Sequence, residues 1–142
     1  MNFSMPEPVH QTTYRVLYGD TDAAGVVYYA NYLKFMERAR TECLRSAGFE
    51  QDVLREKDGI IFAVRSVSID YLKPAQFNNL LNVVSKITKC GRASLTFKQD
   101  ILKEGEQDVL CSAEIKIACL TSNDLRPCPI PEYIMKEMPC DR

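Results

Sequence analysis

The chain has 142 residues, a formal net charge of -1, 46% hydrophobic residues and 26% charged residues. These values are ordinary for one soluble globular domain, so we interpret residues 1–142 as a single domain with a flexible arm over residues 1–11. The balanced charge gives no general attraction to nucleic acid or to an anionic membrane. The segment Met1 to His10 lacks the features of a signal peptide, and no apolar run approaches the roughly 20 residues that span a bilayer. Membrane insertion is therefore not expected.

The residue types available for chemistry are restricted. His10 is the only histidine, and it falls in the predicted arm, which argues against His-based catalysis and His-containing metal sites. We expect no metal and no bound cofactor. The six cysteines form no CxxC pair, and several lie in apolar patterns where a reduced cysteine behaves as a small hydrophobic residue. They are Cys43, Cys90, Cys111, Cys119, Cys128 and Cys140. Reduced thiols in a cytoplasmic protein are the resulting expectation.

The first regular elements are a strand and a long helix. Alternation of apolar and polar residues predicts a strand over residues 12–19, followed by a stretch rich in turn formers up to Gly25. Apolar residues at helical spacing then predict an amphipathic helix from Tyr28 to Ala47, ended by Gly48. Phe35 and Met36 of this helix are expected in the core.

The rest of the chain changes to a period of two. After a short helical stretch at residues 51–57, four segments around Val67, Leu81, Phe97 and Ile115 alternate between apolar and polar residues. This pattern predicts four consecutive strands in an antiparallel meander, followed by a proline-rich tail. One apolar sheet face needs a cover, and the long helix is large enough to provide it. The predicted fold class is α+β, a curved antiparallel sheet packed on one helix.

Two carboxylates, Asp20 and Asp22, lie just before the long helix. The first turn of a helix has backbone N–H groups without helical partners, and these can stabilise an oxyanion formed at a thioester carbonyl. An aspartate beside them could attack that carbonyl or activate a water. The alternative is that both residues only shape the turn or cap the helix. Spacing alone does not separate these interpretations.

The same segment resembles a known family. The run from Tyr18 to Tyr32 is YGDTDAAGVVYYANY, and it continues as ERARTE over residues 37–42. Together with VSIDYLKPA at 67–75 and PIP at 129–131, it resembles the hotdog-fold thioesterases of the 4-hydroxybenzoyl-CoA thioesterase superfamily. It is most similar to the branch associated with the bacterial Tol–Pal envelope system. The order of strand, long helix and strands agrees with a hotdog fold.

The resemblance implies roles for individual residues. Asp22 corresponds to the catalytic carboxylate, as nucleophile or as general base, and the backbone N–H of Tyr29 to the group that polarises the carbonyl. Some members of the Tol–Pal branch carry histidine where this chain has Tyr29, so only the backbone role is transferred. Gly25 would let the backbone approach the substrate closely.

Further residues are assigned to substrate binding. By the same resemblance, Asn31 and Tyr32 line or support the pocket. Lys89, Arg92 and Ser94 surround the Cys90–Gly91 turn, where related enzymes contact the diphosphate or pantetheine of CoA. On charge patterning alone, an ordinary solvated hairpin turn explains these residues equally well.

The resemblance implies a cytoplasmic acyl-CoA thioesterase that releases free acid and CoA. It also implies a homo-oligomer, a dimer of dimers, with active sites between subunits. Two alternatives stay open: hydrolysis of acyl groups on an acyl carrier protein, and a non-catalytic acyl-binding or scaffold protein of envelope assembly. The balanced charge argues against an acidic carrier protein as partner.

Overall fold

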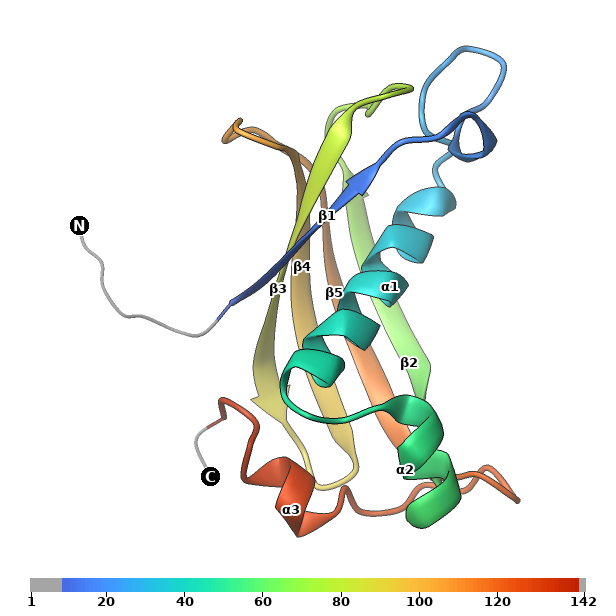
Figure 1. Cartoon of the computed structure of the whole chain (residues 1–142), viewed down its shortest axis with the longest axis vertical. Coiled ribbons are helices and arrows are strands. Elements are labelled where there is room, and N and C mark those ends of the chain that lie inside the picture. Colours follow the sequence, from blue (N-terminus) through green and yellow to red (C-terminus); the bar gives the residue numbers. More distant parts are fainter. Residues whose placement is uncertain (1–8, 141–142) are drawn as a thin grey trace, which may run out of the picture.

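The chain folds as one five-stranded antiparallel sheet with a long helix lying across one face, as the computed structural model of residues 9–140 shows (Figure 1). The elements are β1 (His10–Arg15), a 3₁₀ turn η1 (Tyr18–Asp20), α1 (Asn31–Ser46), α2 (Gln51–Lys57), β2 (Ile60–Tyr71), β3 (Leu80–Cys90), β4 (Ser94–Lys103), β5 (Val109–Thr121) and α3 (Glu132–Met135). The predicted α+β class is confirmed. Within residues 9–140, no helix has both the length and the apolar character needed to cross a membrane.

The strand order is β1-β3-β4-β5-β2, which corrects the predicted meander of four strands. Strands β3, β4 and β5 do form a meander, but β2 pairs with β5 at the far edge of the sheet. The connection from β2 to β3 spans residues 72–79, too long for a tight hairpin. Alternating hydrophobicity reveals which face of a strand is buried, but it does not reveal the strand's neighbour.

The first strand and the long helix have different bounds from those predicted. The first strand ends at Arg15 rather than at residue 19, because the chain then turns into η1. This strand begins at His10, which pairs with Ser85, so His10 and Gln11 belong to the sheet and not to the predicted arm. Residues 1–8 of the predicted arm lie outside the described residues. The long helix begins at Asn31, three residues after the predicted start, since Tyr28 still donates its N–H to the carbonyl of Asp20.

Helix α1 supplies the core residues that cover the inner face of the sheet. Its buried apolar residues are Tyr32, Phe35, Met36, Ala39 and Leu44. They pack against inward-pointing residues of the strands, which include Leu81, Val83, Leu95, Phe97, Ile101 and Ile115. The expected burial of Phe35 and Met36 is confirmed.

One edge of that inner face remains uncovered. Val64 and Val67 of β2 pair with Ile117 and Ile115 of β5, so they share the apolar face, yet they are 51% and 40% exposed. Helix α1 packs mainly over β1 and β3, so it covers this strand edge only in part. The structure therefore presents an apolar strip along an open edge strand.

A polar network is buried under α1. The Arg40 guanidinium is 8% exposed and donates to Oε1 of Gln99 at 3.1 Å. The Gln99 amide in turn donates to the carbonyl of Met36 at 3.0 Å and to Oγ of Ser85 at 2.8 Å. Burial lowers the pKa of Arg40 and the nearby Glu37 carboxylate raises it, and a guanidinium stays protonated in proteins. The neutral Gln99 side chain supplies the hydrogen-bond acceptor of this buried cation.

We predict that Gln99→Leu destabilises the protein by about 2–4 kcal/mol, because it removes the acceptor of a buried guanidinium and leaves other polar groups unpaired. Urea denaturation followed by circular dichroism measures this change. Gln107→Leu at an exposed position is the control and should change stability by less than about 0.5 kcal/mol. Equal stability of the two variants would contradict the assigned role of Gln99.

Candidate active site

The loop between η1 and α1 is fixed to the start of the helix through Asp20. The carbonyl of Asp20 accepts hydrogen bonds from the N–H of Tyr28 at 2.9 Å and from Nδ2 of Asn31 at 3.0 Å. Its carboxylate accepts the N–H of Leu17 at 2.8 Å. Asp20 is thus the turn residue that shapes the loop, and Asn31 supports the loop from the first position of the helix.

Asp22 lies in a short hairpin formed by this loop. Thr21 and Val27 pair across it, and the N–H of Asp22 donates to the carbonyl of Val26 at 2.9 Å. The Asp22 carboxylate is exposed and accepts the N–H of Ala24 at 2.9 Å, an Asx turn. One carboxylate oxygen therefore orients the side chain and the carboxylate remains accessible for chemistry.

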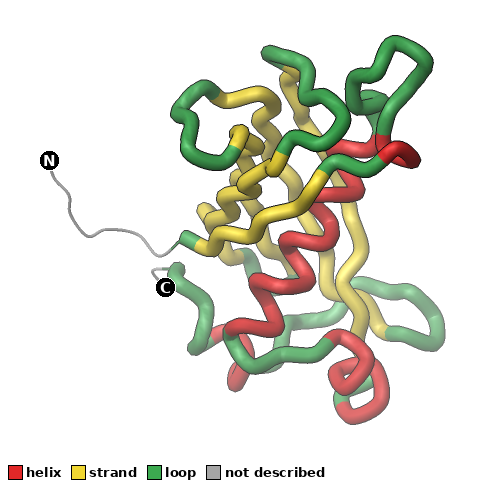
Figure 2. Tube along the Cα trace, turned by 45° about the horizontal axis from the view of Figure 1, so that its top comes forward, coloured by secondary structure: helices red, strands yellow, loops and turns green. Residues whose placement is uncertain are grey.

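Gly25 allows this hairpin to close. Its φ of +83° is in the left-handed region, which a side chain disfavours by about 1–2 kcal/mol. The loop is anchored here to the β2–β3 connection: the Gly25 carbonyl accepts the N–H of Phe77 at 3.2 Å, and Val26 pairs with Gln76. Figure 2 shows these loops at the same end of the molecule as the beginning of α1.

The beginning of α1 offers free hydrogen-bond donors. The N-cap residue Ala30 provides no side-chain cap, and among residues 9–140 the N–H groups of Tyr29 and Ala30 have no acceptor. These groups lie at the positive end of a helix of 16 residues. The Tyr29 side chain is 61% exposed, so it is not a core residue of the helix. The arrangement suits a developing negative charge on a bound carbonyl.

Tyr32 connects the helix to the loop after β2. Its hydroxyl accepts the N–H of Ala75 at 2.9 Å, and burial raises the pKa of this phenol, which keeps it neutral. A cleft of about 260 Å³ lies beside it. The cleft is lined by Val27, Tyr29, Tyr32, Tyr71, Leu72, Lys73 and Pro74.

A second depression of about 380 Å³ runs from the start of α1 along the uncovered face of β2. It begins at Ala30 and Asn31, and its apolar lining includes Leu33, Val64 and Val67. Arg40 lines its far part. We name this depression the α1–β2 groove.

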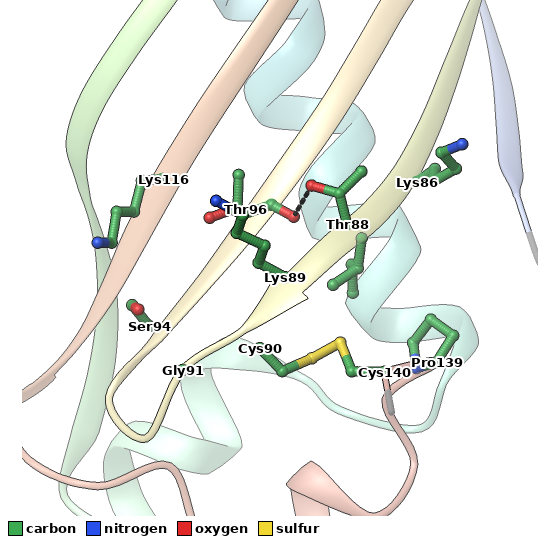
Figure 3. Close-up of a pocket in the computed structure, with 11 residues that line it drawn as sticks. Lys86, Thr88, Lys89, Cys90, Gly91, Ser94, Thr96, Lys116, Pro139 and Cys140 are labelled. Atoms are coloured by element: carbon green, nitrogen blue, oxygen red, sulfur yellow. Dashed lines mark hydrogen bonds between the residues drawn. A yellow bond between two sulfur atoms is a disulfide. The ribbon is translucent and has the colours of Figure 1, made fainter. Parts of the chain in front are cut away.

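The predicted CoA-binding residues lie around a third and larger cavity of about 680 Å³ (Figure 3). Lys89 and Ser94 line it, but Arg92 does not. Lys86 and Lys116, which were not among the predicted binding residues, add to its cationic lining. We call this cavity the lysine pocket. Strands β3, β4 and β5 contribute side chains to it side by side, an arrangement that only the strand order reveals.

Within one chain, the predicted site residues do not form a single site. The loop of Asp22 and the β3–β4 turn of Lys89 and Ser94 lie at opposite ends of the sheet (Figure 1). Helix α1, with 16 residues, is about 24 Å long and separates them. Two candidate half-sites result: one at the start of α1 and one in the lysine pocket.

The expectation of reduced thiols is wrong for one pair. Cys90 at the end of β3 and Cys140 in the C-terminal segment form a disulfide, 50 residues apart in sequence, and both line the lysine pocket. Cys43, Cys111, Cys119 and Cys128 are free. Sequence analysis missed this bond because cysteine spacing does not report which thiols meet in space.

The sequence profile of the thioesterase superfamily matches residues 24–110. A Haemophilus influenzae protein named acyl-CoA thioesterase YbgC is 38% identical over 120 residues, which cover 84% of this chain and 87% of that protein. The crystal structure of a probable thioesterase from Bartonella henselae has a TM-score of 0.82 at 35% identity, covering 87% of this chain and all of that one. A 4-hydroxybenzoyl-CoA thioesterase crystallised with 4-hydroxybenzoyl-CoA has a TM-score of 0.86 at 18% identity, over 91% of this chain and 97% of that chain, a likeness of fold alone.

We predict that Tyr32→Phe lowers the free energy of unfolding by about 1–3 kcal/mol, because the buried N–H of Ala75 loses its acceptor. Chemical denaturation measures the change. Tyr18→Phe is the matched control, since Tyr18 is 79% exposed and the same atom is removed. If Tyr18→Phe cost as much as Tyr32→Phe, the hydroxyl of Tyr32 would have no special structural role.

Proposed function

This chain belongs to the thioesterase superfamily and has its hotdog fold, and from that premise we propose that it hydrolyses acyl-CoA to a free acid and CoA, with Asp22 as the catalytic carboxylate. The observation that carries the proposal is the pair of free N–H groups at the start of α1, beside a loop that presents an exposed carboxylate. The acyl-CoA specificity is supported by the name of the H. influenzae relative.

The proposed reaction divides the work between backbone and side chain. The carbonyl oxygen of the thioester accepts hydrogen bonds from the N–H of Tyr29 at the positive end of α1, which stabilises the oxyanion of the tetrahedral intermediate. Asp22 either attacks the carbonyl carbon, forming an anhydride that water opens, or removes a proton from the attacking water. The CoA thiolate leaves in both routes. Water that opens the anhydride at the Asp22 carbonyl leaves its oxygen on Asp22, so ¹⁸O found on Asp22 after a single turnover in labelled water identifies the anhydride route.

A productive site requires two chains in this proposal. A single acyl-CoA that contacts both the Asp22 loop and the lysine pocket must reach the pocket of a neighbouring chain, because one chain holds them at opposite ends. The open edge of β2 and the exposed Val64 and Val67 provide a surface for such a neighbour. We propose a dimer through this surface and a tetramer of two such dimers.

The α1–β2 groove is the place that we assign to the acyl group. It starts at Ala30 and Asn31, next to the proposed oxyanion donors, and it is closed on one side only, so the neighbouring chain would complete it. Asn31 and Tyr32 then act by supporting the loop and the helix start. We further propose that the enzyme acts in the cytoplasm and is related in role to the Tol–Pal-associated branch.

We predict that Asp22→Asn lowers kcat for acyl-CoA by between about a hundredfold and ten-thousandfold, because the amide neither attacks a carbonyl nor accepts a proton. Release of CoA thiol from a panel of short, long and aromatic acyl-CoAs measures the rate and identifies the acyl class. Asp20→Asn is the matched comparison: its amide oxygen still accepts the N–H of Leu17, so the loss should stay below about tenfold. Full activity of Asp22→Asn would remove this residue from the mechanism. Inactivity of the wild type on every substrate would favour an acyl-binding protein instead.

We also predict that Val67→Arg prevents dimer formation at micromolar concentration, since it places a charge in an apolar contact. Sedimentation velocity measures the molecular mass, and hydrolysis should fall together with dimer content. Val53→Arg on α2, where Val53 is 43% exposed, is the control and should keep the oligomer. A wild-type protein that sediments as a monomer would contradict the two-chain site.

A further inference from the structure

The C-terminal segment, residues 127–140, is held to the sheet by a cysteine near each of its ends, through a thiol contact at its start and a disulfide at its end. At its start, Sγ of Cys128 lies 3.7 Å from Sγ of Cys119 on β5, and the Cys128 N–H donates to the Cys119 carbonyl at 3.0 Å. At its end, Cys140 is bonded to Cys90 of β3. Between them, Ile130 donates its N–H to the carbonyl of Arg92 at 2.9 Å, and Ile134, Met135 and Met138 are buried. The segment closes the bottom of the molecule below the β3–β4 turn (Figure 1).

The disulfide end of this segment forms part of the lysine pocket. Pro139 and Cys140 line the pocket together with Lys86, Lys89 and Lys116 (Figure 3). The wall made by Pro139 and Cys140 is thus joined covalently to β3 next to a cationic cluster. A wall that limits water access strengthens the attraction between these cations and an anionic ligand, because the local dielectric constant falls.

The bonded pair is also accessible to a small thiol. Cys90 and Cys140 are half-buried and line a cavity of about 680 Å³, which admits a small thiol. Cys111 and Cys119, in contrast, are 0% exposed, and burial raises the pKa of each to about 12, so neither supplies a thiolate near neutral pH.

We propose that the Cys90–Cys140 disulfide is a redox-controlled clamp, which holds the C-terminal segment against the lysine pocket and tightens binding of the phosphate-bearing part of the substrate. Reduction releases Pro139 and Cys140 from β3, and the pocket loses this wall. The proposal rests on the proposed function for its ligand. In a cytoplasmic setting, disulfides are usually transient, which fits a switch better than a permanent structural bond.

A low-molecular-weight thiol such as glutathione reduces the Cys90–Cys140 disulfide by thiol–disulfide exchange. One thiolate attacks a sulfur of the pair, forms a mixed disulfide and releases the other cysteine as a thiolate, which takes up a proton. A second small thiolate attacks the small-thiol sulfur of the mixed disulfide. The second cysteine is released as a thiolate, which takes up a proton, and the two small thiols leave joined as their disulfide. Two electrons thus pass to the protein, and the reverse sequence, starting from oxidised glutathione, restores the clamp.

The first arm of the test does not depend on activity. Full-length protein is equilibrated in glutathione buffers of graded redox poise, alkylated and weighed intact by mass spectrometry, with peptide mapping of Cys90 and Cys140. We expect one two-electron transition of this pair within the buffered range, and roughly tenfold faster amide hydrogen exchange over residues 130–140 after reduction. A pair that stays reduced, or stays oxidised, at every poise would overturn the proposal, as would unchanged exchange.

The second arm measures binding in both redox states. Reduction should raise KM for acyl-CoA and Kd for free CoA by roughly fivefold with kcat unchanged, the equivalent of about 1 kcal/mol. The double variant Cys90→Ser/Cys140→Ser should show the weaker values in both states, and the control Cys43→Ser on α1 should keep the redox response. Equal values for reduced and oxidised wild type would overturn the clamp. Because free CoA is a probe that needs no turnover, an inactive protein whose CoA affinity still follows the redox state would refute the hydrolase and support the clamp.

Discussion

One helix is too narrow to cover this sheet, and the rest of the architecture follows from that mismatch. A helix with its side chains is about 10–12 Å wide, whereas the outer strands of a five-stranded sheet lie about 19 Å apart. Helix α1 packs mainly over the side of β1 and β3, and Val64 and Val67 in the middle of β2 remain exposed. The uncovered strip creates the α1–β2 groove and an open edge for a neighbouring chain. In the proposed function, this same strip becomes the acyl site and the dimer interface.

The loop before α1 is held in place by hydrogen bonds to the start of the helix and to the β2–β3 connection. Asp20 and Asn31 join the loop to the helix, and Gly25 and Val26 join it to the β2–β3 connection. The polar groups of the loop are largely satisfied by this network, yet the N–H groups of Tyr29 and Ala30 remain without acceptors among the described residues. In the proposed function, a rigid loop with free donors is preorganised for a carbonyl oxygen, so little reorganisation would accompany the reaction.

The distribution of charge follows the same division of the molecule. The carboxylates Asp20 and Asp22 lie at one end, while Lys86, Lys89 and Lys116 gather at the other. A substrate with a reactive thioester at one end and phosphates at the other needs both kinds of site, but it meets them on different chains in the proposed dimer. The C-terminal segment, held by Cys90–Cys140, then shapes only the phosphate end, which separates control of affinity from the chemistry.

The local features of this protein could be predicted from its sequence. Periodicity predicted α1 and the faces of the strands, and the family resemblance of the run from Tyr18 to Tyr32 pointed to the candidate catalytic loop, because each signal depends on residues close together in the chain. Tertiary structure alone decided that β2 pairs with β5, that Lys86 and Lys116 replace Arg92 in the lysine pocket, and that Cys90 meets Cys140. It also placed Arg40 against Gln99. These contacts join residues far apart in sequence, and no local pattern encodes a partner that only the closed fold brings within reach.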